Sequence, residues 1–183
     1  RADGWFEGTD SNALAAIGHS RLVTNGLQGI DSNNQTVWRD EVVVIHNGIV
    51  VNVDDLWERE KANGLAPRAD VDTEVIAALI SRYRREGATV EAAISQVFQD
   101  IYGETSIAFF LRDTNAMYLA TNTGSLYMCV NAAGTGMFFA SERHICAQLT
   151  EGSGAIPGFE RAVITQWRPG QGATVNLETL DMN

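Results

Sequence analysis

The sequence predicts an α+β fold in which runs of β-strands surround a block of helices. The chain has 183 residues, of which 45% are hydrophobic, and this length suits one domain with a closed core better than two. Apolar residues recur at helical spacing between residues 54 and 101, and the pattern changes to short strand-like runs after Gly103. No internal repeat or linker divides the sequence, so we expect a single domain over residues 1–183.

The N-terminal part is predicted to contain two strand regions and a long polar loop. A strand is expected over residues 13–22, followed by a loop over residues 23–40 that is long enough to suggest a functional role. Residues 41–51 form a nearly continuous apolar run, which predicts a buried strand. Asn47-Gly48 interrupts this run, and such a pair is typical of a tight turn between two strands.

Three helices are predicted between residues 54 and 101. Asp54-Asp55 marks the start of the first helix and Gly64 its end. The second helix begins near Asp72, and Thr89 caps the third. Both carry an apolar face at helical spacing, formed by Val75, Ile76, Leu79, Ile80 and Tyr83 in the second and by Val90, Ile94, Val97, Phe98 and Ile101 in the third.

The segment after Gly103 is predicted to consist mainly of strands separated by turns. A short helix is expected over residues 141–149. The expected strands cover residues 105–112, 116–121, 125–131, 136–140, 161–165 and 173–177.

The composition argues against several classes of partner and compartment. The chain has 13 Lys and Arg against 23 Asp and Glu, a formal net charge of −10, which repels nucleic acid and anionic lipid. No apolar run reaches the roughly 18 residues that a membrane span needs. Cys129 and Cys146 lack a C-x-x-C spacing and fit the cytoplasm, although the sequence leaves open one disulfide between them. The histidines have no metal-ligand spacing and no nucleotide motif occurs, so we expect neither a metal nor a cofactor.

Three polar segments interrupt apolar elements near their ends, where side chains can reach a cleft. They are residues 18–26 (G-H-S-R-L-V-T-N-G), 46–48 (H-N-G) and 71–74 (V-D-T-E). Arg21 could grip a carboxylate in two hydrogen bonds or form an ordinary surface ion pair. Asn47-Gly48 could form an oxyanion hole or a plain hairpin turn. Asp72 could bind an ammonium group or simply suit the dipole of a helix N-terminus.

Taken in order, G-H-S-R-L-V-T-N-G, V-V-V-I-H-N-G-I-V and D-T-E-V-I resemble the motifs of class II glutamine amidotransferase domains. The nearest likeness is the glutaminase half of glucosamine-6-phosphate synthase, and asparagine synthetase and amidophosphoribosyltransferase share looser forms. The resemblance extends from about residue 17 to about residue 175. It implies an N-terminal nucleophile hydrolase fold, a four-layer αββα sandwich in which glutamine lies across the open ends of two antiparallel sheets.

The resemblance also implies roles for individual residues. Arg21 would grip the α-carboxylate of glutamine, and Asp72 would hold its α-ammonium group. Thr24 would line the same pocket together with Asn25, which stands where the family's W-A-T-H-G motif has histidine. The side chain of Asn47 and the Gly48 N–H would form the oxyanion hole.

The family's nucleophile is a cysteine at the mature N-terminus, whose own α-amine serves as the base. This sequence opens with Arg1 instead. The segment Arg1-Ala2-Asp3-Gly4 is similar to an R-G-x-D-G segment that lies after the first strand and helix of the family. We therefore expect the nucleophile segment to lie upstream of the printed sequence, because neither Cys129 nor Cys146 has a free α-amine.

The activity that the resemblance implies is hydrolysis of L-glutamine to glutamate and ammonia through a γ-glutamyl thioester. Ammonia would then pass to an acceptor, such as a sugar phosphate, on a synthase domain or a separate subunit. A homo-oligomer is compatible with the sequence. Two alternatives stay open: a degenerate domain that binds glutamine or a partner without catalysis, and a related hydrolase that cleaves another amide.

Overall fold

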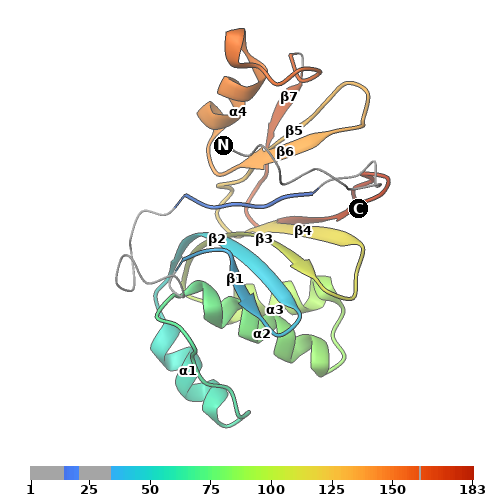
Figure 1. The fold of residues 1–183 in the computed structure, drawn as a ribbon. Helices are drawn as coiled ribbons and strands as arrows, with labels where there is room; N and C mark the ends of the chain where they lie inside the picture. Colours follow the sequence, from blue (N-terminus) through green and yellow to red (C-terminus); the bar gives the residue numbers. More distant parts are fainter. Residues whose placement is uncertain (1–14, 21–33, 161) are drawn as a thin grey trace.

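The computed structural model describes residues 15–20, 34–160 and 162–183, which form two β-sheets and the helices that cover them (Figure 1). The helices are α1 (Val53–Lys61), α2 (Thr73–Arg85), α3 (Val90–Asp100) and α4 (Arg143–Thr150), with a short 3-10 turn at Gly152–Gly154. The strands are β1 (Val37–Arg39), β2 (Val42–Val50), β3 (Gly103–Leu111), β4 (Ala116–Thr121), β5 (Tyr127–Val130), β6 (Met137–Ala140), β7 (Val163–Gln166) and β8 (Gln171–Asn176).

Both sheets are antiparallel throughout. The larger one has the strand order β1-β2-β3-β4-β8, and the smaller one has the order β6-β5-β7. The helices α2 and α3 cover one face of the larger sheet, and α4 contacts all three strands of the smaller one (Figure 1). The elements are therefore stacked as helices, larger sheet, smaller sheet and helix, which confirms the four-layer αββα arrangement.

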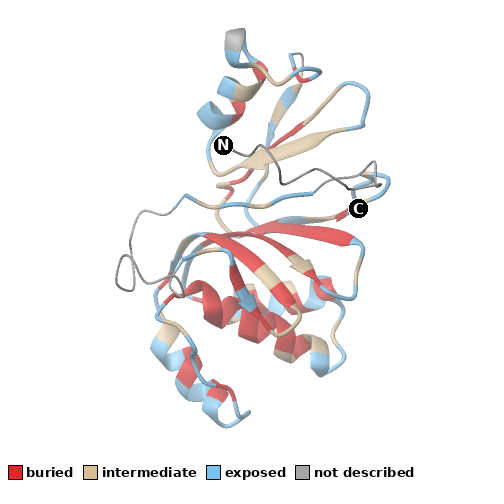
Figure 2. Cartoon of the chain, viewed as in Figure 1, coloured by how far each residue is buried: buried red, intermediate tan, exposed pale blue. Residues whose placement is uncertain are grey.

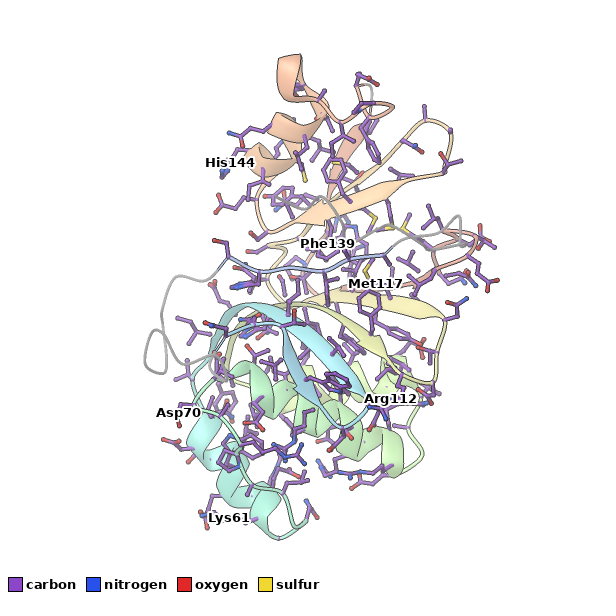
Figure 3. All side chains as sticks on the ribbon, in the orientation of Figure 1. Lys61, Asp70, Arg112, Met117, Phe139 and His144 are labelled. Carbon is purple, nitrogen blue, oxygen red and sulfur yellow. The ribbon has the colours of Figure 1, made fainter. Side chains whose placement is uncertain are left out.

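Three apolar clusters fill the spaces between these layers. The first lies between α2, α3 and the larger sheet and includes Ile76 and Phe109, where Figure 2 shows most of the buried residues. The second lies between the two sheets, where Met117 of β4 and Phe139 of β6 contribute (Figure 3). The third joins α4 to the smaller sheet. Because each sheet buries both faces, the β-strands of the interior read as apolar runs with little alternation.

The predicted helices agree with the structure to within about two residues at most ends, because their start and stop signals are specific. Thr89 caps α3 by accepting a hydrogen bond from the Ala92 N–H at 3.2 Å. None of the helices in the described ranges is long and apolar enough to cross a membrane. Cys129 and Cys146 are both buried free thiols, so the disulfide that the sequence left open is not formed.

Three predictions for the N-terminal part are wrong. Asn47-Gly48 is not a hairpin turn, because β2 runs unbroken from Val42 to Val50 and pairs with β3 along its full length. The loop predicted over residues 23–40 contains a strand, β1, whose three residues are too few to give a sequence pattern. Residues 15–20 form no strand, and the rest of the segments predicted at 13–22 and 23–33 lies outside the described residues.

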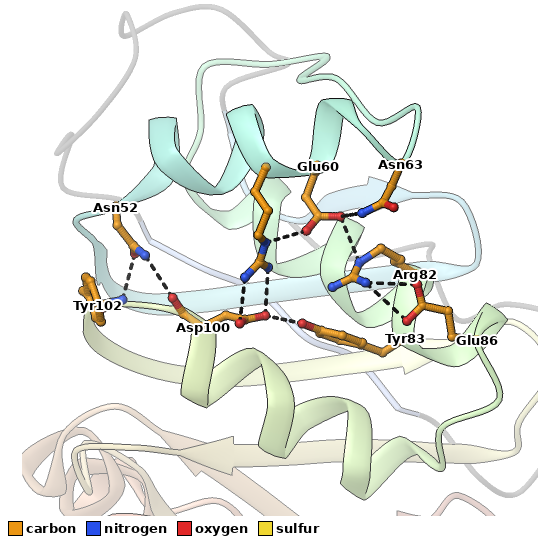
Figure 4. Close-up of polar contacts among 9 residues, drawn as sticks. Asn52, Glu60, Asn63, Arg82, Tyr83, Glu86, Asp100 and Tyr102 are labelled. Atoms are coloured by element: carbon orange, nitrogen blue, oxygen red, sulfur yellow. Dashed lines mark hydrogen bonds and ion pairs between the residues drawn. The ribbon is translucent and has the colours of Figure 1, made fainter.

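A polar network fastens α1 to α2 and α3 (Figure 4). Arg59 of α1 donates two hydrogen bonds to Asp100 at the end of α3, at 2.8 and 2.9 Å. Tyr83 of α2 donates a hydrogen bond to the same carboxylate. The buried carboxylate of Glu60 forms ion pairs with Arg59 and Arg82, each at 2.9 Å. Since these residues come from three helices, the network fixes the helical layer on which the α2 N-terminus depends.

Candidate functional site

The structure brings three of the predicted site residues to one end of β2. Asn47 and Gly48 belong to β2 itself, and Asp72 directly precedes α2. The other three, Arg21, Thr24 and Asn25, lie outside the described residues, so their predicted roles stay predictions.

Asp72 is buried, with 5% of its surface exposed, and its carboxylate contacts β2 and does not cap α2. Its Oδ2 atom accepts a hydrogen bond from the Val50 N–H at 3.0 Å. A cap would have explained an acid at this position as a purely local feature, but the side chain makes no cap hydrogen bond. The contact with Val50 instead places a negative charge beside the strand that carries Asn47 and Gly48.

Beyond the part of β2 that pairs with β1, side chains form hydrogen bonds with the backbone of β2 where a neighbouring strand would otherwise pair. The ladder between β1 and β2 includes the pair of Val37 and Val44. Further along, the Gln35 amide pairs with both backbone groups of His46, accepting from its N–H at 2.6 Å and donating to its C=O at 2.8 Å. Asp72 then takes the Val50 N–H. Gly48 therefore lies between two side-chain contacts at a place where no neighbouring strand of the described chain covers this edge.

His46 has a fully buried side chain next to Asp72. Burial lowers the pKa of His46 below its ordinary value, and the Asp72 carboxylate only partly offsets this effect, so the ring is neutral at pH 7. Nε2 lies 3.4 Å from the Glu104 C=O, and this contact assigns the proton to Nε2. Nδ1 is then an acceptor 3.9 Å from Asp72 Oδ1, and it has no hydrogen-bond partner among the described residues. A group with two or more hydrogens, such as an ammonium ion, could satisfy both acceptors.

Gly48 occupies a backbone conformation that a side chain would not tolerate. Its φ is +138°, and an added Cβ would overlap the Glu104 carbonyl of β3. Gly103 on β3 has φ of +137° and would overlap the Ile49 carbonyl in the same way. The two strands thus approach each other closely at this end, which explains why glycine is required at position 48.

The opposite face of the same strand end carries a polar row. The register pairs Asn47 with Ser106 and Ser106 with Thr121, so one row crosses β2, β3 and β4. The next row inward belongs to the apolar cluster between the sheets and consists of Ile45, Ala108 and Leu119. Asn47 is exposed, and its side-chain amide forms no hydrogen bond with any described residue. The space between the sheets is therefore apolar inside and polar at the end where Asn47 lies.

Glu74 supports the loop that leads to Asp72. Its buried carboxylate accepts hydrogen bonds from the Arg68 N–H at 2.9 Å and the Ala69 N–H at 2.8 Å. It also pairs with the buried guanidinium of Arg39, which lies over the Trp57 ring at 5.0 Å. This network ties β1, α1 and the loop to the first turn of α2.

The two cysteines have no part in this site. Cys129 of β5 and Cys146 of α4 belong to the cluster between the smaller sheet and α4. Burial raises the pKa of Cys129 to about 12 and also raises that of Cys146, so both stay protonated thiols at neutral pH. Among the described residues there is also no group of three or more His, Cys, Asp or Glu side chains that could hold a metal ion.

Comparison with known proteins decides the family. The model of a glutamine amidotransferase domain matches residues 19–148, which is more than half of the chain. The chain belongs to this glutamine amidotransferase family. The matched range contains all the predicted site residues, including those that the structure does not describe, and this confirms the family expected from the three motifs.

Curated relatives carry the name glutamine-fructose-6-phosphate aminotransferase (isomerizing). The protein from Halalkalibacterium halodurans is 28% identical over 171 residues, which cover 92% of this chain and 27% of that protein. The protein from Thermococcus kodakarensis is 31% identical over 127 residues, which cover 68% of this chain and 21% of that protein. This chain therefore spans about a quarter of the length of these relatives.

Solved structures agree on the fold. Glutamine phosphoribosylpyrophosphate amidotransferase from B. subtilis superimposes with a TM-score of 0.61 at 22% identity, covering 83% of this chain and 32% of that chain. The similarity supports the N-terminal nucleophile hydrolase type of αββα sandwich that the motifs implied.

Several residues of the site were not predicted from the sequence. No role was predicted for the side chain of His46, yet its Nδ1 lies 3.9 Å from Asp72 Oδ1. Gln35 gave no signal because a side chain that replaces a strand has no sequence pattern. Ser106 gave none because only the register shows that it lies opposite Asn47.

Proposed function

We propose that this domain hydrolyses L-glutamine to glutamate and ammonia. The observation that carries the proposal is the meeting of Asn47, Gly48 and the buried Asp72 carboxylate at one end of β2. A free α-amino acid with a side-chain amide needs an anion for its ammonium group and hydrogen-bond donors for its amide oxygen. The hydrogen-bond donors lie at Asn47 and Gly48 of β2, and the anion, Asp72, contacts Val50 of the same strand.

Asp72 and His46 would hold the α-ammonium group of the substrate. The carboxylate supplies the charge, and the neutral His46 Nδ1 supplies a second acceptor 3.9 Å from Asp72 Oδ1. Arg21 would pair with the α-carboxylate, with Thr24 and Asn25 beside it. These contacts fix the amino-acid end and so direct the side chain of the substrate toward Asn47.

The Asn47 side-chain amide and the Gly48 N–H would stabilise the tetrahedral intermediate. When a nucleophile attacks the γ-carbonyl carbon, the π electron pair of the C=O bond moves to the oxygen, which becomes negatively charged. Hydrogen-bond donors already in position stabilise this oxyanion and lower the activation barrier. Removing one such donor in other enzymes costs about 2.7–4 kcal/mol. Expulsion of ammonia leaves a γ-glutamyl thioester, and water then releases glutamate and regenerates the thiol.

The nucleophile would be a cysteine at the mature N-terminus, upstream of Arg1. Support comes from the family and from the position of the two cysteines in the printed sequence, which are buried in another layer with raised pKa values. An N-terminal cysteine also provides the α-amine that accepts the thiol proton.

The ammonia would pass to an acceptor on another domain or subunit. The relatives, whose names specify transfer to fructose 6-phosphate, are more than three times as long as this chain. A sugar phosphate is therefore the acceptor class that we propose, with a synthase domain or subunit as the partner and the domain in the cytoplasm.

Substitution of Arg21 tests the pocket assignment in the full-length protein. We expect Arg21→Ala to abolish glutamine binding and hydrolysis while the thermal unfolding temperature stays unchanged, and Arg143→Ala on the exposed face of α4 serves as the matched control. Glutamine binding that survived Arg21→Ala would contradict the assignment. Wild-type protein that binds glutamine but releases no glutamate would favour a degenerate binding domain.

A further inference from the structure

The polar row between the sheets contains a hydroxyl whose proton has no acceptor in the described part of the chain. Ser106 of β3 lies between Asn47 of β2 and Thr121 of β4 in the register, and 5% of its surface is exposed. Its Oγ atom lies 2.7 Å from the Thr121 Oγ1 atom. The direction of this one hydrogen bond determines what else Ser106 can do.

Thr121 must be the donor in this pair. Its Oγ1 atom already accepts a hydrogen bond from the Gly124 N–H at 2.9 Å and a longer one from the Thr123 N–H at 3.3 Å. A hydroxyl oxygen has two lone pairs and one proton, so both lone pairs of Thr121 are occupied. Its proton is therefore directed to Ser106, and Ser106 accepts.

Ser106 consequently keeps its own proton for another partner. No second hydrogen bond of this hydroxyl is formed with any described residue. Ser106 is buried, and a buried donor without an acceptor costs free energy. Its environment therefore favours an acceptor supplied from outside the described chain.

The position of Ser106 indicates which acceptor this is. Directly opposed residues on antiparallel strands have Cβ atoms about 4.5–5.5 Å apart and point to the same face, so Ser106 and Asn47 face the same space. Further into the sheets the row of Ile45, Ala108 and Leu119 offers no polar group. A polar acceptor for Ser106 is therefore expected from the polar end of this space, where Asn47 lies.

We propose that Ser106 is a substrate-contacting residue that donates its hydroxyl proton to the side-chain carboxamide oxygen of glutamine, beside Asn47. Thr121 is a positioning residue, because its hydrogen bond holds the Ser106 oxygen and leaves the Ser106 proton directed toward the substrate. This inference rests on the proposed glutaminase function and adds a determinant of specificity for a side-chain amide.

The test compares Ser106→Ala with Ser95→Ala, an exposed serine on α3, in the full-length protein. Loss of one hydrogen bond to a neutral partner weakens an interaction by about 0.5–1.5 kcal/mol, so Ser106→Ala should lower kcat/KM for glutamine about 2- to 12-fold. L-Norvaline has the same α-amino acid end without the amide, and its inhibition constant should stay unchanged. Ser106→Thr, which keeps a hydroxyl, should recover most of the activity.

The possible results separate this inference from the proposed function. Wild-type protein that does not hydrolyse glutamine overturns both. Active wild-type protein with unchanged kcat/KM in Ser106→Ala overturns the inference alone. Equal losses for glutamine and norvaline also overturn it, because they would show a structural effect on the whole pocket.

Discussion

Replacing Asp72 by asparagine isolates the charge that we assign to substrate binding. The amide is almost the same size as the carboxylate, and its oxygen can still accept from the Val50 N–H, which now lies 3.0 Å from Oδ2. Its NH2 group can donate to the Nδ1 atom of His46, which has no hydrogen-bond partner among the described residues. The free energy of unfolding should therefore fall only by the difference between a charged and a neutral hydrogen bond, about 1 kcal/mol, which lowers Tm by a few degrees.

Glutamine hydrolysis should respond far more strongly. Removing one member of a buried, hydrogen-bonded charge pair costs about 2–5 kcal/mol, which corresponds to a loss of at least about 30-fold in kcat/KM. Glutamate release by full-length protein over a range of glutamine concentrations measures this loss. Asp55→Asn, which changes an exposed acid in the first turn of α1, should change the rate less than twofold. A loss below threefold for Asp72→Asn, with the fold intact, would refute the assignment of Asp72.

Three further predictions concern the groups around the site. Gly48→Ala should abolish hydrolysis and lower Tm by several degrees, because position 48 has φ of +138°, where a residue with a side chain is strained. A variant with normal Tm and activity would contradict this. Glu74→Gln should lower the free energy of unfolding by about 3–5 kcal/mol, measured by thermal unfolding, since it leaves the buried Arg39 guanidinium without an anionic partner. Glu58→Gln, on the exposed face of α1, should lower it by less than about 1 kcal/mol. Equal effects of the two variants would contradict the role of the buried pair. Burial raises the pKa of Asp100, but hydrogen bonds from Arg59 and Tyr83 outweigh this effect and lower the pKa overall. The ionised Asp100 therefore stabilises the fold above the unfolded pKa of about 3.9, and this stabilisation is lost as the pH falls below that value. In Asp100→Asn the free energy of unfolding should depend less on pH in that range, and an unchanged pH dependence would contradict this.

The elements that sequence predicted well are those with local signals. The helices α2 and α3 are defined by apolar faces and by a cap such as Thr89, and these depend on residues within one or two turns. The strand β4 was predicted with its observed limits, because turns flank it on both sides. The order of the motifs identified the family, and with it the layers of the fold.

The parts that sequence could not provide depend on contacts between distant residues. Asn47-Gly48 has the local pattern of a turn, yet β3 pairs with the whole of β2 and keeps it extended, so tertiary pairing overrides the local preference. The burial of Asp72 against Val50 joins residues 22 positions apart. Ser106 has no unusual neighbours in sequence, and only the register across β2, β3 and β4 places its hydroxyl beside Asn47.

The most direct test of the proposed function is the release of glutamate and ammonia from L-glutamine by the full-length protein, with its mature N-terminus determined by intact mass and N-terminal sequencing. We expect an N-terminal cysteine, equal molar amounts of both products, and complete inhibition by a glutamine analogue that alkylates this one thiol. Full-length protein that carries the N-terminal cysteine and binds glutamine, but releases no glutamate, would contradict our conclusion that this site hydrolyses glutamine.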